Sequence, residues 1–271
     1  WLEKGYKGLV CADCGSEAVE WTAWNGTTAL KNLSAGNYYL TQNIEITAVQ
    51  VISKDIAIDL CGHNITGNGN RAIYINGVTM SIVDCADVDD QIGKITGFAN
   101  EGSNPAITIV KNGSNGGVLN IYGGKIVNNT STTPGGGVIS VSAGTTLNMY
   151  GGEISHNTVV RGAICGSATA NPYTINILGG MITGNTATGT DNLGGGAGVY
   201  SFSPVTVGGD AKVYGNTGME GRNADIYLRN DGSFTGALVL SDEKPLEQGA
   251  QINYGLWTSE TDTAALQMIS S

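Results

Sequence analysis

The chain is poor in charge, in proline and in aromatic residues. Charged residues make up 13% of its 271 residues, against a usual share of about 25%, and it has only 5 prolines and 2 histidines. Collagen is excluded, because proline is scarce and glycine follows no three-residue period. The net charge of −10 argues against nucleic acid and against an anionic membrane surface as partners. No apolar run approaches the ~20 residues of a membrane-spanning helix, so we expect no membrane insertion.

Glycine is abundant instead, with 42 residues, and 41% of the chain is hydrophobic, which favours a folded protein over a disordered one. A sequence unit recurs at spacings of 28 to 31 residues. Its copies include LNIYGGKIVNN (119–129), LNMYGGEISHN (147–157) and INILGGMITGN (175–185). The closing position of the unit falls at Asn68, Phe98, Asn129, Asn157, Asn185 and Asn216.

Each unit holds three short runs rich in Ile, Val, Tyr and Thr, separated by Gly, Asn and Ser clusters. Polar and apolar residues alternate in these runs, which is typical of strands, and helical periodicity is absent. Three strands in about thirty residues predict coils stacked at about 4.8 Å. We therefore predict an all-β fold, a single-stranded right-handed parallel β-helix of about seven coils over residues 36–240. Residues 1–35 are expected to cap it, and residues 241–271 to form a last coil, a second cap or the root of a linker.

Aligning the units predicts which side chains share a column along the β-helix. Ile58 is placed in one inward column with Leu119, Leu147, Ile175 and Val205. Asp59 is placed in an outward polar column with Ser81, Asn120, Asn148, Asn176 and Thr206. Paired glycines (123–124, 151–152, 179–180 and 208–209) are expected at corners that need unusual backbone angles. A structural amide ladder is expected at Asn68, Asn129, Asn157, Asn185 and Asn216.

The GG-x-I-x-x-N unit followed by GGG-V or GGG-A-G-V resembles right-handed β-helix repeats in large surface proteins of Gram-positive gut bacteria. It is also similar to the GGA-[ILV] and FxxN repeats of chlamydial polymorphic outer-membrane adhesins. The segment Trp21–Leu40 resembles the entry to such domains in the first group. The resemblance implies a pectate-lyase-like superfold, a secreted or surface-attached location and a longer parent polypeptide. It leaves function open, because such β-helices host lyases, hydrolases, adhesins and stalks.

Tyrosines in outward positions suggest a surface for sugars. Tyr122 and Tyr150 occupy one column in consecutive coils, next to Asn120 and Asn148. A second outward column is predicted to hold Tyr74, Tyr200 and Tyr227, interrupted by Thr108, Ile139 and Cys165. Aromatic rings stack on pyranose faces while amides bond sugar hydroxyls, so these residues are the candidate glycan site. The alternative is that tyrosine simply suits exposed strand positions.

The carboxylates offer weaker candidates. If the chain is an enzyme, Asp59 and Asp84 are its nearest approach to a catalytic pair, although they fall in different columns. An acidic run could hold calcium or be a solvated loop, and its members are Asp84, Asp87, Asp89 and Asp90. No other cofactor is expected. His63 and His156 occupy different columns, without the Cys or Ser of a catalytic triad.

Five cysteines complete the candidate chemistry. Cys11 and Cys14 form a C-x-x-C, which could be a local disulfide, a redox pair or half of a zinc site. Cys61 and Cys85 lie one coil apart and could bridge if their Cβ vectors agree. Cys165 remains single in a strand column.

Two functions from different classes follow. The first is a non-catalytic extracellular module, a stalk or adhesin that binds host or dietary glycans or a host surface protein. The alternative is a polysaccharide-cleaving enzyme, either a glycoside hydrolase or a lyase.

Overall fold

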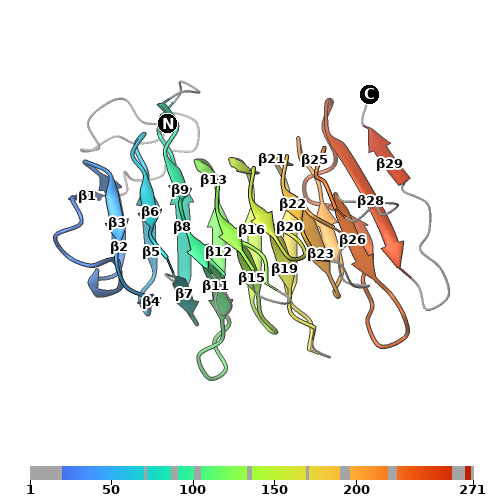
Figure 1. The fold of residues 1–271 in the computed structure, drawn as a ribbon, viewed down its shortest axis with the longest axis horizontal. Helices are drawn as coiled ribbons and strands as arrows, with labels where there is room; N and C mark the ends of the chain where they lie inside the picture. Colours follow the sequence, from blue (N-terminus) through green and yellow to red (C-terminus); the bar gives the residue numbers. More distant parts are fainter. Residues whose placement is uncertain are drawn as a thin grey trace.

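The computed structural model describes residues 20–69, 72–86, 91–100, 105–132, 136–168, 171–189, 196–218, 225–257 and 266–269. Apart from one turn of 3₁₀ helix, η1 (Leu30–Asn32), the regular structure of these residues is all β. Short strands stack in chain order along the long axis of the molecule (Figure 1). Neighbouring strands from successive coils pair in parallel, which confirms the predicted parallel β-helix.

Three faces surround the interior. The first face is a nine-stranded parallel sheet made of β1 (Trp21–Trp24), β2 (Gly36–Leu40), β5 (Ile56–Asp59), β8 (Thr79–Val83), β12 (Val118–Ile121), β16 (Thr146–Met149), β20 (Thr174–Ile177), β24 (Val205–Val207) and β27 (Leu238–Leu240). The second face follows seven of these strands, β2 to β24, across a corner. It is made of β3 (Ile44–Ile46), β6 (Ile65–Gly67), β9 (Lys94–Thr96), β13 (Lys125–Val127), β17 (Glu153–Ser155), β21 (Met181–Thr183) and β25 (Lys212–Tyr214).

The third face returns the chain to the first. It is made of β4 (Gln50–Ile52), β7 (Ile73–Asn76), β11 (Ile107–Val110), β15 (Ile139–Val141), β19 (Ile164–Gly166), β23 (Val199–Ser201) and β26 (Ile226–Arg229). A small parallel sheet follows the second face, with β10 (Ala99–Asn100), β14 (Thr130–Ser131), β18 (Thr158–Val159) and β22 (Thr186–Ala187). At the C-terminal end β28 (Gln251–Trp257) pairs with both β25 and β26 and so joins the second and third faces. The last strand, β29 (Leu266–Ile269), pairs with β28 in the antiparallel sense.

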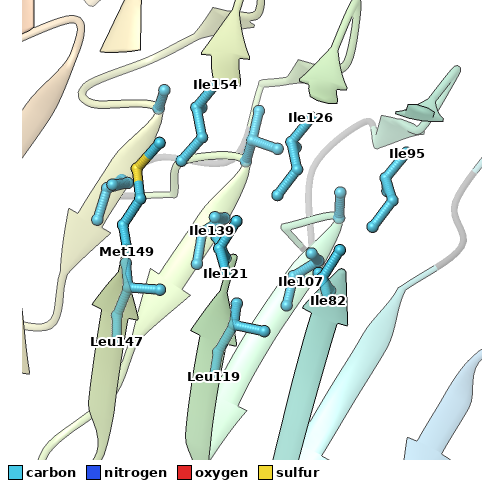
Figure 2. Close-up of a cluster of buried hydrophobic side chains, with 14 of the residues drawn as sticks. Ile82, Ile95, Ile107, Leu119, Ile121, Ile126, Ile139, Leu147, Met149 and Ile154 are labelled. Carbon is cyan, nitrogen blue, oxygen red and sulfur yellow. The ribbon is translucent and has the colours of Figure 1, made fainter. Parts of the chain in front are cut away.

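Inward side chains from the three faces meet in one hydrophobic core. In Figure 2, Ile82 and Ile121 come from the first face, Ile126 from the second, and Ile107 and Ile139 from the third. All five are at most 2% exposed. Because side chains alternate along a strand, the remaining positions of these strands point outward and repeat from coil to coil.

On the first face the expected columns hold from Ser81 onward and are wrong for the coil of β5. Ile58 pairs with Ile82, which pairs with Ile121, so Ile58 lies two positions away from the column of Leu119. Asp59 accordingly pairs with Val83 and not with Ser81. The shift leaves Ile58 inside the core because two residues are one full period of a strand.

Paired glycines form the corners between the first and second faces, as predicted. Gly152 has φ of 78°, a left-handed conformation that side chains with a Cβ rarely adopt. Gly151 is confined for a different reason, since a Cβ there would lie 2.5 Å from the carbonyl oxygen of Tyr122 in the preceding coil. The corner therefore needs one glycine for its backbone angle and one for the close approach of coils.

A buried amide ladder runs through the corner at the end of the second face. Each asparagine of the ladder donates two hydrogen bonds, one from its backbone N–H and one from its side-chain amide. Both go to the side-chain oxygen of the next ladder residue along the chain, at 2.7 to 3.1 Å. Each amide also donates to a backbone carbonyl of the preceding coil. The members are Asn129, Asn157, Asn185 and Asn216, and Asp225 accepts from the last of them. The structural role predicted for these four asparagines is confirmed.

Asn68 is not part of this ladder, and its predicted place there is wrong. It stands one coil before Phe98 in the same register, but it is exposed. Phe98 is fully buried, and a Cβ on Gly67 would lie 2.5 Å from its ring. The ring takes the space that a ladder amide would need, and the ladder begins where the backbone N–H of Phe98 donates to Asn129.

The described part of the expected cap, residues 20–35, contributes β1 and η1. Trp24 is buried and its indole N–H donates to the carbonyl of Thr28 at 2.8 Å. Residues 1–19 lie outside the described residues.

The ladder predicts a sharp difference between two asparagines of one coil. Asn157→Ala leaves the buried backbone N–H of Asn129 and one of its two amide hydrogens without an acceptor, so we expect a loss of roughly 2–4 kcal/mol of unfolding free energy. The matched control Asn148→Ala removes a half-buried amide on the first face, and we expect a loss of about 1 kcal/mol or less. Urea unfolding of both variants tests this, and equal losses would contradict it.

Candidate functional site

Tyr122 and Tyr150 form an exposed aromatic pair. They follow β12 and β16 directly, and their side chains are 51% and 36% exposed. The ring centroids lie 4.9 Å apart and the ring planes are within 11° of each other. This distance matches the spacing of paired strands, so the coil repeat itself stacks the rings. The predicted outward column of these two tyrosines is confirmed.

A row of polar side chains lies beside the pair on the outer side of the first face. Asn176 donates to Asn148 at 2.8 Å, Asn148 to Asn120 at 2.9 Å, and Asn120 to Ser81 at 3.4 Å. The three asparagines are half-buried. An amide has two donor hydrogens and a carbonyl with two acceptor positions, so one bond to each neighbour leaves capacity for ligand hydroxyls.

The second predicted tyrosine column is not a surface. Tyr74 is half-buried, but Tyr200 and Tyr227 are 0% and 2% exposed, so their predicted exposure is wrong. Tyr200 and Tyr227 do point away from the main core. They form a second, separate hydrophobic cluster with Cys165 and Phe202. The column also runs through Ser140, while Ile139 faces the core.

The segment that follows β26 covers this second cluster. Phe234 packs against it, with its ring centroid 4.6 Å from that of Phe202. The segment is held by Thr235, whose N–H donates to the carbonyl of Phe202, and by the Arg229 guanidinium over the Phe234 ring at 4.9 Å. Burial raises the pKa of Tyr200 to about 12, although the charges of Arg161 and Arg229 oppose the rise.

The carboxylates of Asp59 and Asp84 hold the backbone of one corner. Asp59 is fully buried and accepts the N–H groups of Cys61 and Cys85, at 2.9 and 3.0 Å. Asp84 accepts from Gly62 and two further backbone N–H groups. Desolvation raises the pKa of Asp84, with a smaller contribution from the charge of Asp59, while its N–H donors oppose the rise. The two acids lie close enough to interact, and both serve this corner.

The same corner brings Asp59, Cys61 and Cys85 together. The two Sγ atoms are 2.9 Å apart, and one ligand atom from each of the three residues lies within 4.8 Å of the others. Asp59 is buried and both cysteines are half-buried. These three residues form a group that could hold a metal ion. The sequence placed Cys61 and Cys85 near each other, but it gave no sign that Asp59 joins them.

One of the two histidines lies beside a serine side chain. His156 Nδ1 lies 3.0 Å from Ser155 Oγ, and Ser155 also bonds Glu153, which pairs with Lys125 at 3.1 Å. The acid contacts the serine and not the histidine, and Ser155 is fully buried, so the arrangement differs from a catalytic triad. His63 is half-buried.

Several candidate residues lie outside the described residues. These are Cys11 and Cys14 of the C-x-x-C, and Asp87, Asp89 and Asp90 of the acidic run. Their predicted roles stay predictions.

No family model, no curated protein and no solved structure matches the chain. In the described part of the chain, no helix is both long enough and apolar enough to cross a membrane.

The environment of the aromatic pair lets us predict how Tyr122 titrates with pH. Partial burial raises the pKa of Tyr122 above its ordinary value, and the neighbouring Tyr150 hydroxyl adds to the shift. The folded state therefore favours the neutral phenol, so the stability from this group is complete below pH ~10 and is lost as pH rises through the folded pKa. We expect Tyr150→Phe to lower the pKa of Tyr122 and leave it above the ordinary value. NMR of labelled tyrosine rings measures this, with Tyr122→Phe assigning the signal, and a Tyr122 pKa at or below 10 would contradict it.

Proposed function

We propose that this chain is a non-catalytic extracellular module of a bacterial surface protein, and that it meets host or dietary glycans on its first face. The observation that carries the proposal is the stacked, solvent-exposed pair of Tyr122 and Tyr150 beside the amide row. Exposed aromatic surface next to spare amide hydrogen-bonding capacity suits sugars, which present apolar ring faces ringed by hydroxyls.

The stacking geometry specifies how a sugar would bind. Each ring covers one face of the other, so a pyranose cannot insert between them. The outer face of Tyr122, on the side of β8, is the stacking surface, because Tyr122 is the more exposed of the two. Asn120 lies two residues before it on the same side of β12 and would bond the sugar hydroxyls.

The scaffold suits a stalk or adhesin. Its core is continuous and its coils are joined by buried hydrogen bonds, which supports a rigid rod with a binding face along one side. We further propose that the chain belongs with the β-helix repeat domains of Gram-positive gut-bacterial surface proteins. A secreted or surface location and a longer parent polypeptide come with that proposal.

The alternative function, a polysaccharide-cleaving enzyme, depends on Asp59 and Asp84 as its catalytic pair. Calcium binding would depend on Asp84 together with the acidic run. Asp59 and Asp84 both accept backbone N–H groups of their own corner. The proposal therefore assigns them to the scaffold and the glycan contact to the tyrosines. A host surface protein as partner would use the same exposed face.

A glycan array with matched tyrosine variants tests the proposal. We expect the wild-type chain to bind a subset of glycans, and Tyr122→Ala to weaken that binding by about tenfold, the effect of losing ~1.4 kcal/mol of ring contact. The double variant Tyr122→Ala with Tyr150→Ala should lose the signal. Tyr74→Ala on the third face is the control and should bind as the wild type does.

Thermal melts must show that each variant is folded. An array without wild-type signal, or a double variant that binds unchanged, would overturn the glycan proposal. Bound glycans are then incubated with the protein, and released reducing ends are measured. Release that disappears in Asp84→Asn would favour the enzyme in place of the adhesin.

A further inference from the structure

The corner after β5 places two cysteines around one buried carboxylate. Cys61 follows β5 and has φ of 50°, while Cys85 follows β8 in the next coil. Backbone N–H groups of both cysteines donate to the same oxygen, Oδ1 of Asp59. The carboxylate thus fixes both cysteine backbones from one point. It has a second oxygen, and a carboxylate offers about four lone-pair positions.

The ligand atoms of Asp59, Cys61 and Cys85 could surround one small ion if the two Sγ atoms move slightly apart. They all lie within 4.8 Å of one another, as the ligands of a common ion must. With metal–sulfur bonds of ~2.3 Å, tetrahedral geometry places two thiolates roughly 3.8 Å apart. The Sγ atoms are now 2.9 Å apart, so they must separate by less than an ångström, which rotation of half-buried cysteine side chains can supply.

The ligand set selects the kind of cation. Two thiolates with one carboxylate suit a borderline ion such as Zn²⁺, and they are poor ligands for Ca²⁺ and Mg²⁺, which take oxygen ligands. Three protein ligands leave a fourth tetrahedral position, and the half-buried cysteines place it within reach of water.

We propose that Asp59, Cys61 and Cys85 bind one thiophilic divalent cation of the Zn²⁺ type, with water as its fourth ligand. Binding releases two thiol protons, so that M²⁺, two thiols and one carboxylate give a site of net charge −1 and two protons in solution. The ion joins the coil of β5 to the coil of β8.

Cobalt(II) is the probe, because thiolate coordination gives it a charge-transfer absorption. The full chain is fully reduced and carries Cys11→Ser and Cys14→Ser, so that the C-x-x-C cannot contribute. We expect one Co²⁺ per chain, a thiolate band that Zn²⁺ abolishes, and a higher melting temperature with the ion bound. Cys61→Ser and Cys85→Ser should each lose the band, and Asp59→Asn should weaken Co²⁺ binding at least tenfold.

Cys165→Ser is the matched control. This cysteine is fully buried in the second hydrophobic cluster, and burial raises the pKa of its thiol to about 11, so its removal should leave Co²⁺ binding unchanged. Melting curves without metal show whether each variant folds, and Cys85→Ala replaces Cys85→Ser if the latter does not. The proposal is overturned if the reduced chain takes up no Co²⁺. It also fails if the band survives Cys61→Ser, or if reductant cannot restore two thiols from a Cys61–Cys85 disulfide.

Discussion

Stacking of the coils depends on the hydrogen bonds that each corner makes with the next coil, and the buried asparagine ladder supplies them where the second face ends. Buried backbone groups without partners cost free energy, so a corner inside the fold needs donors and acceptors of fixed position. An asparagine provides both, and can therefore serve the coils before and after it at once. Every link has the same direction, so the last link requires an acceptor only. Asp225 meets that requirement, and the amide of Asn253 donates to its other oxygen at 2.9 Å.

This fixed register is what organises the outer surface. Because the coils cannot slip against one another, outward residues repeat at the strand spacing, and two tyrosines placed 28 residues apart become a stacked pair. The same repeat aligns Asn120, Asn148 and Asn176 into a hydrogen-bonded row. The proposed glycan surface is thus a direct consequence of the corner chemistry inside.

The sequence was sufficient to predict the fold, the corner glycines and the inward columns of the regular coils. These features follow from the period of the repeat, so their prediction fails in coils whose length departs from that period. The corner from Ile58 to Ile65 is two residues longer than the one from Ile121 to Ile126, which explains the slipped alignment of Asp59. Burial of Tyr200 could not be foreseen, because the cover comes from Phe234 in a segment outside the repeat.

The irregular corner explains why the acids and thiols gather there. In the regular coils, two glycines turn the corner, and backbone groups of adjacent coils bond each other. The longer corner has extra N–H groups, at Cys61 and Gly62 among others, and the carboxylates of Asp59 and Asp84 accept them. The acids that resemble a catalytic pair in the sequence thus have a structural reason to be close. That reason also places the two cysteines around Asp59, since both donate their N–H groups to it. The proposed metal site at this corner would follow from the same cause, because the carboxylate that accepts the extra N–H groups also holds both cysteines beside it.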